Sequence, residues 1–198
     1  MRFGGKTWAG YLLALASAQF MLLLMLCESI APGYSMHNNA ISDLGTIDQT
    51  RLVFNLSLMG VGVFNILSGY ALYLVIPSKK NFTIMILAGI GAIGAGLIPL
   101  DSPIGLHGLF ALFAFVFINI EAIVIGQLSN GFLKYASLAA GLIGLIFVPI
   151  MILVDGGSID VAGSIGHGGA ERMIAFPAMI WMMVFGGYLV ASPKLKER

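Results

Sequence analysis

Six long apolar segments follow one another along the chain, and they restrict its fold more than any other feature. Each holds roughly 20 residues, which is enough for an α-helix to cross a hydrocarbon core of about 30 Å. Backbone amides in lipid must be hydrogen-bonded within the protein, so segments of this length favour helices. The expected transmembrane helices are Trp8–Cys27, Leu52–Ile76, Phe82–Leu100, Leu106–Leu128, Tyr135–Val154 and Met173–Val190.

The composition agrees with a membrane protein. Only 10% of the residues are charged and 59% are hydrophobic, whereas soluble domains carry about 25% charged residues. The formal net charge is +1 and no basic run is present, so nucleic acid is not an expected partner. We therefore predict an all-α fold: a bundle of six transmembrane helices that forms a single domain over residues 1–198.

The charges in the connecting segments predict the orientation of this bundle. With six helices, seven of the nine acidic residues and all three histidines fall on the side opposite the termini, together with only Arg51 and Arg172. Basic loops face the cytoplasm, which places both termini there and puts the polar residues on the extracytoplasmic face of the cell membrane. The basic residues on the cytoplasmic side are Arg2, Lys6, Lys79, Lys80, Lys134, Lys194, Lys196 and Arg198.

The glycine-rich segment before the last helix, residues 155–172, gathers ionisable side chains. If the helix begins near Gly166, the i, i+4 spacing of His167 and Glu171 places both on one helix face. A histidine and a carboxylate so placed could ligate zinc or act as an acid–base pair. Glu171 also suits an ordinary role, in which a carboxylate near a helix N-terminus balances the helix dipole.

Two further connections on this side carry charges at unfavourable helix ends. Arg51 opens a helix at its positive end, and Asp101 closes one at its negative end, so each should have a partner of opposite charge. His107 begins the following helix, and Ser42 and Asp43 lie in the first long connection, where either could cap a turn.

These residues define a candidate site. Asp101, His107, His167 and Glu171 are the candidate catalytic residues, and a zinc ion could be held by His107, His167 and Asp101. The candidate ligand-binding residues are Ser42, Asp43, Arg51 and Arg172. The alternative is an ion-pair network without metal, in which Arg51 and Arg172 neutralise Asp43, Asp101 and Glu171.

Glu121 stands apart, because it lies in the middle of the fourth apolar segment. An ionisable group at this depth costs on the order of 3 kcal/mol on insertion scales and usually faces the bundle or a cavity. It is either a hydrogen-bonded neutral acid or a relay for protons or substrate. Small residues in the third and fifth segments, such as Gly91 and Gly144, are expected to pack helices closely.

Three motifs carry a resemblance to a known family. They are Ile41-Ser-Asp-Leu-Gly45, Gly96-Leu-Ile-Pro-Leu-Asp101 followed by His107, and Gly169-Ala-Glu-Arg172 followed by Pro177 and Trp181. With them the chain resembles the DUF998 family, six-helix membrane proteins of bacteria and archaea without an assigned activity. The resemblance implies that Asp43, Asp101, His107, Glu171 and Arg172 are motif positions.

A more distant similarity, in residue types alone, is to the alkaline ceramidase and adiponectin receptor superfamily of zinc hydrolases. The chain departs from it by having His167-xxx-Glu171 where that superfamily has His-xxx-His, and six segments rather than seven.

The leading hypothesis is an extracytoplasmic pocket that binds a lipid head group or a small amphiphile, with membrane lipids as partners. Metal- or histidine-assisted hydrolysis or group transfer would fit such a pocket, and whether the protein is an enzyme stays open. Two alternatives remain: a proton-coupled small-molecule transporter that uses Glu121, or a non-catalytic subunit of a homo-oligomer or larger membrane complex.

Overall fold

All six apolar segments form α-helices in the computed structural model, which describes residues 4–191. Each of the six is long and apolar enough to cross a membrane, so the prediction of a helical multi-pass membrane protein is confirmed. No β-strand occurs among the described residues. The α-helices are α1 Gly5–Ile30, α2 Arg51–Tyr73, α3 Lys79–Leu97, α4 His107–Ile125, α5 Phe132–Asp155 and α6 Gly166–Ala191, and the 3-10 helices are η1 Ile41–Gly45, η2 Gly126–Leu128 and η3 Ile159–Ile165.

The largest departure from the predicted boundaries is at α6, which begins at Gly166 rather than Met173. Gly166 has a φ of 68°, a conformation open to glycine, and it turns the chain from η3 into the helix. Glycines in the first turn weaken a helix signal read from sequence. Tertiary contact holds the turn, because the Gly168 N–H donates to the His37 carbonyl at 3.0 Å. The expected long loop over 155–172 is therefore largely helical.

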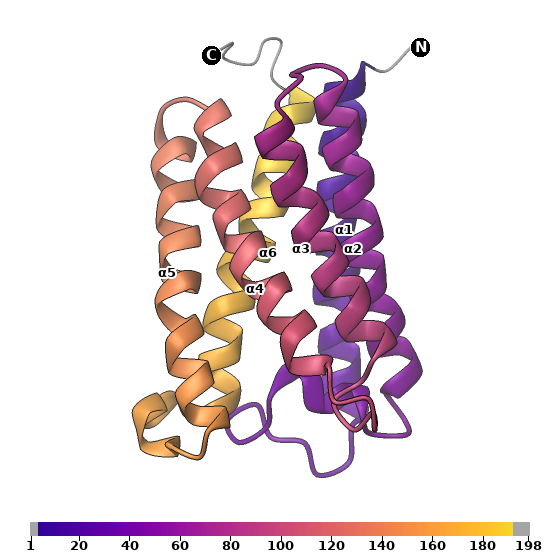
Figure 1. Cartoon of the computed structure of the whole chain (residues 1–198), viewed down its shortest axis with the longest axis vertical. Coiled ribbons are helices and arrows are strands. Elements are labelled where there is room, and N and C mark those ends of the chain that lie inside the picture. Colours follow the sequence, from indigo (N-terminus) through magenta and orange to yellow (C-terminus); the bar gives the residue numbers. More distant parts are fainter. Residues whose placement is uncertain (1–3, 192–198) are drawn as a thin grey trace.

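The helices form a closed ring. Each helix packs against the next one in sequence, α1 packs against α6, and α4 also contacts α6 across the ring. The described chain starts and ends at the same end of the bundle (Figure 1). The opposite end carries the connections over 31–50, 98–106 and 156–165, and we call it the site end.

Close approaches between backbones hold the ring together, as predicted for the small residues. A Cβ atom added at Gly91 of α3 would lie 2.8 Å from the Ala114 Cα atom of α4. Gly62 of α2 and Gly89 of α3 face one another in the same way, as do Gly10 of α1 and Gly186 of α6. Glycine at these positions lets the helices pack in lipid, where burial of apolar side chains supplies no driving force.

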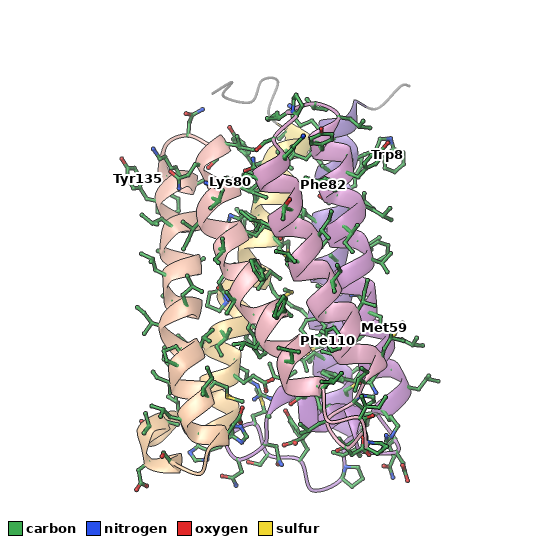
Figure 2. All side chains as sticks on the ribbon, viewed as in Figure 1. Trp8, Met59, Lys80, Phe82, Phe110 and Tyr135 are labelled. Atoms are coloured by element: carbon green, nitrogen blue, oxygen red, sulfur yellow. The ribbon has the colours of Figure 1, made fainter. Side chains whose placement is uncertain are left out.

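The outer surface of the bundle is apolar. Leu52 is 70% exposed and Leu22 is 62% exposed, as expected for side chains that face hydrocarbon. Figure 2 shows Trp8 and Tyr135 projecting outward near the end that holds the described termini. Amphipathic rings are typical of the level of the lipid head groups.

Candidate functional site

A cavity of about 180 Å³ lies at the site end, between the start of α4 and the end of α5. Figure 1 shows α4 diverging from α5 toward this end, and residues of α6 and η1 complete the lining. The walls are apolar, with Leu112, Phe115 and Val148 among them. The polar side chains that line the cavity are Ser42, His107, Asp155, His167 and Glu171.

His107 lies in the cavity wall at the first residue of α4, and only 6% of it is exposed. Its Nδ1 lies 2.8 Å from the Ile98 carbonyl oxygen and 3.1 Å from that of Ala95. Since both partners are acceptors, Nδ1 must carry the proton. The Nε2 atom of a neutral ring is then an acceptor, and none of the described residues offers it a hydrogen bond.

Glu171 shares this cavity from the second turn of α6 and is 3% exposed. One carboxyl oxygen, Oε2, accepts a hydrogen bond from the backbone N–H of Ile41, which ties α6 to the start of η1. The other oxygen has no partner among the described residues. His167 and Glu171 line the same cavity, as their i, i+4 spacing predicts for a helix that begins at Gly166.

His167 Nε2 lies 3.0 Å from Asp155 Oδ1, which joins the first turn of α6 to the last residue of α5. The pair is partly exposed, with side-chain exposures of 29% and 57%, so it sits at the rim rather than the floor. Asp155 belongs to the same polar segment in the sequence, 155–172, where nothing singles out its partner. It enters the site because η3 folds back and brings the two helix ends together.

Acceptors outnumber donors in this cavity. Glu171 and Asp155 bring carboxylates and His107 brings an acceptor nitrogen, while no arginine or lysine lies among the described residues that line the walls. The arginines expected to bind a ligand are both occupied elsewhere. A group that donates hydrogen bonds therefore suits this cavity better than a phosphate does.

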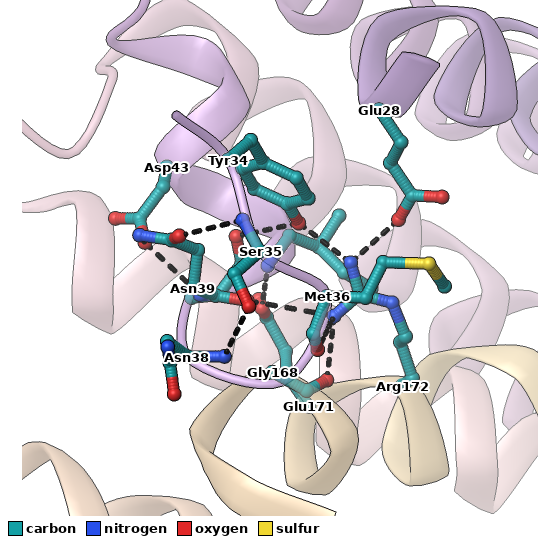
Figure 3. Close-up of polar contacts among 12 residues, drawn as sticks. Glu28, Tyr34, Ser35, Met36, Asn38, Asn39, Asp43, Gly168, Glu171 and Arg172 are labelled. Atoms are coloured by element: carbon teal, nitrogen blue, oxygen red, sulfur yellow. Dashed lines mark hydrogen bonds and ion pairs between the residues drawn. The ribbon is translucent and has the colours of Figure 1, made fainter. Parts of the chain in front are cut away.

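Arg172 of α6 forms hydrogen bonds with the first long connection, residues 31–50 (Figure 3). Its Nη2 donates to Glu28 Oε1 and to the Tyr34 hydroxyl, each at 2.5 Å. Its Nη1 donates to the carbonyl oxygens of Gly168 at 2.7 Å and Met36 at 3.1 Å. Arg172 is 7% exposed and does not line the cavity, so its observed contacts position the connection.

Tyr34 completes this cluster, because its hydroxyl accepts from Arg172 and donates to the Ala40 carbonyl at 3.0 Å. Burial raises the pKa of Tyr34 to about 12 from an ordinary value of 10.0, and the nearby Arg172 only partly offsets this. The neutral hydroxyl is thus the form that the fold stabilises.

Tyr34 should therefore titrate about two pH units above an exposed tyrosine. Its contribution to stability should be complete below pH 10 and should be lost as the pH rises through 12. The chain has six tyrosines. The absorbance of ionised tyrosine is therefore followed against pH in the wild type and in Tyr34→Phe, and the difference between the two curves is the titration of Tyr34. Ionisation of Tyr34 near pH 10 would contradict the burial argument.

Arg51 and Asp101 form an ion pair, which confirms that each has a partner of opposite charge. Arg51 Nη2 lies 2.5 Å from Asp101 Oδ2, and Nη1 lies 3.1 Å from Oδ1, so the contact is bidentate. The Arg51 hydrogen bond holds the pKa of Asp101 below its usual range. The side chains are 38% and 44% exposed, and neither lines the cavity.

Asp43 serves its own loop. Its Oδ2 accepts from the Ala40 N–H at 3.0 Å and from the Asn39 side chain at 3.2 Å, which caps η1. This matches the expectation of a capped turn. The neighbouring Ser42 lines the cavity, whereas Asp43 does not.

The structure does not assemble the expected zinc ligands. Both oxygens of Asp101 face Arg51, Nδ1 of His107 faces two carbonyl oxygens, and His167 pairs with Asp155. Within residues 4–191, no three histidine, cysteine or acidic side chains are grouped so that they could hold a metal ion. The combination of His107, His167 and Asp101 therefore does not fit a zinc site.

Glu121 is fully buried near the C-terminal end of α4, away from the site end. Its Oε2 accepts from Asn65 Nδ2 of α2 at 2.7 Å, and Asn65 Nδ2 also donates to the Met85 carbonyl of α3. The other oxygens of the pair, Glu121 Oε1 and Asn65 Oδ1, have no partner among the described residues. The pair thus links three helices and leaves two acceptors unsatisfied.

Comparison with known proteins identifies a family and nothing beyond it. No curated protein and no solved structure matches the chain. A family model described as "Protein of unknown function (DUF998)" matches residues 14–188, which covers all six helices at least in part. The chain is therefore a member of the DUF998 family of multi-pass membrane proteins.

Proposed function

We propose that the cavity at the site end binds an amphiphile whose head group donates hydrogen bonds, such as a primary amine or an alcohol. The observation that carries this proposal is the chemistry of the walls: free acceptor atoms on His107 and Glu171 at the polar end, and hydrocarbon elsewhere. Neither atom has a hydrogen-bond donor among the described residues, and a donating head group would supply one.

A charged amine fits better than a neutral donor. Glu171 and Asp155 supply two carboxyl groups, and the described lining residues include no lysine or arginine. Charge-assisted hydrogen bonds are about twice as strong as neutral ones. Phosphate head groups would instead face these carboxylates, because Arg51 and Arg172 are engaged by Asp101 and Glu28.

The size of the cavity limits what can enter it. Pockets for drug-sized ligands measure roughly 300–1,000 Å³, whereas this one has about 180 Å³. It would accommodate a head group and the first part of one chain, but not a phospholipid with two chains.

The proposal includes a location. Lys79, Lys80 and Lys134 lie at the end opposite the cavity, as does Lys6. This distribution supports an extracytoplasmic site end in the cell membrane. The other basic residues behind the predicted orientation, Arg2, Lys194, Lys196 and Arg198, lie outside the described residues.

Binding of dodecylamine to the purified protein in detergent tests this proposal. Glu171→Gln should weaken binding about tenfold or more, because it removes the acid that would pair with the amine. The amide oxygen can still accept from the Ile41 N–H, so the fold should persist. Asp101→Asn is the matched control, since Asp101 is a carboxylate at the same end outside the cavity, and it should bind as the wild type does.

Dodecyl phosphate supplies the same chain with an anionic head group, and it should bind more weakly than the amine. Equal binding by Glu171→Gln and the wild type, or a preference for the phosphate, would refute the assignment.

A further inference from the structure

We propose that the bundle also contains the site for the amphiphile's tail: a slot for one unbranched alkyl chain that runs from the head-group cavity past Phe115 and ends at Asn65. The inference rests on the proposed function and extends it to the substrate class. It predicts a single-chain ligand with a limit on its length.

Three cavities lie in series along this line. The head-group cavity and a second one of about 40 Å³ share His107, Ala111 and Glu171 in their walls. The second cavity and a third one of about 50 Å³ share Phe20, Leu58 and Ala175. Phe115 lines all three, so the cavities meet around this one ring.

The exposure of residues along α4 indicates the same hollow. From Gly108 to Phe117 none of its residues is buried, although α4 packs against α3, α5 and α6. A helix in a filled bundle buries one face and exposes the other. Here the inner face borders the cavities, and the outer face is left for lipid. Protein interiors are close-packed, so a hollow along three helical turns requires an explanation.

The slot is narrow and apolar along its length. Single methyl groups from three helices, Ala95 of α3, Ala114 of α4 and Ala175 of α6, line its middle part. The small volumes there leave room for one chain and exclude two side by side. An unbranched alkyl chain matches this shape and chemistry, and it would reach the polar mouth at Glu171 with its head group.

Asn65 forms a polar end to the slot. It is 1% exposed, it lines the third cavity, and its Oδ1 has no hydrogen-bond partner among the described residues. Its Nδ2 is held by Met85 and Glu121, so the amide cannot turn away without losing both bonds. Asn65 therefore closes this end of the slot as a fixed side chain in the cavity wall, and an alkyl chain offers it no hydrogen bond in exchange for moving. The chain should therefore stop short of it.

Affinity across a series of n-alkylamines tests the slot. Each added methylene should strengthen binding about fourfold while the slot fills, and further methylenes should add nothing once the chain reaches Asn65. Ala92→Leu places a larger side chain in the third cavity alone, so it should move this plateau to shorter chains. Ala88→Leu is a second variant of the same kind, should the first fail to fold.

Ala139→Leu adds the same atoms on the exposed face of α5 and should leave the plateau unchanged. Each variant is compared with the wild type in the same detergent, so partition of the amines into micelles cancels. If the amines bind and depend on Glu171, but Ala92→Leu and Ala88→Leu keep the wild-type plateau, the slot is wrong and the head-group site stands. If no amine binds, both proposals fall.

Discussion

Replacing Arg172 by methionine should lower the free energy of unfolding by about 3–5 kcal/mol, the usual cost of removing one partner of a buried ion pair. The guanidinium of Arg172 joins Glu28 at the end of α1, Tyr34 in the first connection and the Gly168 carbonyl in α6. Methionine fills a similar volume but donates no hydrogen bond. The Glu28 carboxylate, 12% exposed, would then lose its partner, together with the carbonyl oxygens that Arg172 satisfies.

Arg51→Met provides a matched control for this prediction. Both arginines pair with a carboxylate at 2.5 Å, but the Arg51–Asp101 pair is 38% and 44% exposed. Exposed pairs contribute little to stability, because water screens them, so Arg51→Met should cost much less than Arg172→Met. Equilibrium unfolding in mixed micelles, with rising fractions of a denaturing detergent, measures both variants. Similar losses for the two would show that burial of Arg172 does not govern its contribution.

Gly91→Val should destabilise the bundle by about 3 kcal/mol, at the upper part of the range for overpacked cores. A Cβ atom at residue 91 would meet the Phe110 carbonyl oxygen and the Ala114 Cα atom, each at 2.8 Å. Both are backbone atoms of α4, so no side chain can move aside. The helices would have to separate, and the contacts along α3 and α4 would loosen together.

Gly187→Ala is the control for this steric effect, because it adds a side chain to a helix glycine that has no close neighbour. Gly187 lies in α6 with nothing within 4 Å of an added Cβ atom, so alanine should be neutral or stabilise by about 0.4–1 kcal/mol. Thermal unfolding followed by circular dichroism in detergent compares the two. A Gly91→Val protein as stable as the wild type would mean that the α3–α4 contact is not tight.

The fold could be predicted from sequence because each helix is encoded in its own apolar segment. Parts of the site followed from local rules as well: the charges of Arg51 and Asp101 at the wrong helix ends predict partners, and the spacing of His167 and Glu171 predicts one face.

The contacts of Arg172 could not be predicted in this way. Its partners Glu28 and Tyr34 lie 144 and 138 residues away in sequence, and they reach it only because α1 closes the ring against α6. For the same reason the sequence suggests a ligand-binding arginine at a position where both Nη atoms of Arg172 donate hydrogen bonds to the protein itself. The contact between Asp155 and His167 could not be predicted either, because it depends on the fold of η3, which glycines obscure.

Closure of the ring between α1 and α6 also has a consequence for synthesis. The first helix leaves the ribosome long before the last, so the inner face of α1 has no partner until α6 is made. The Ser17 hydroxyl, for example, donates to the Met179 carbonyl of α6 at 2.6 Å. Until α6 inserts, the growing chain is an open arc with two unsealed edges. Insertion chaperones and neighbouring lipids would meet those edges first, and a truncation before α6 should expose them to degradation rather than leave a smaller stable bundle.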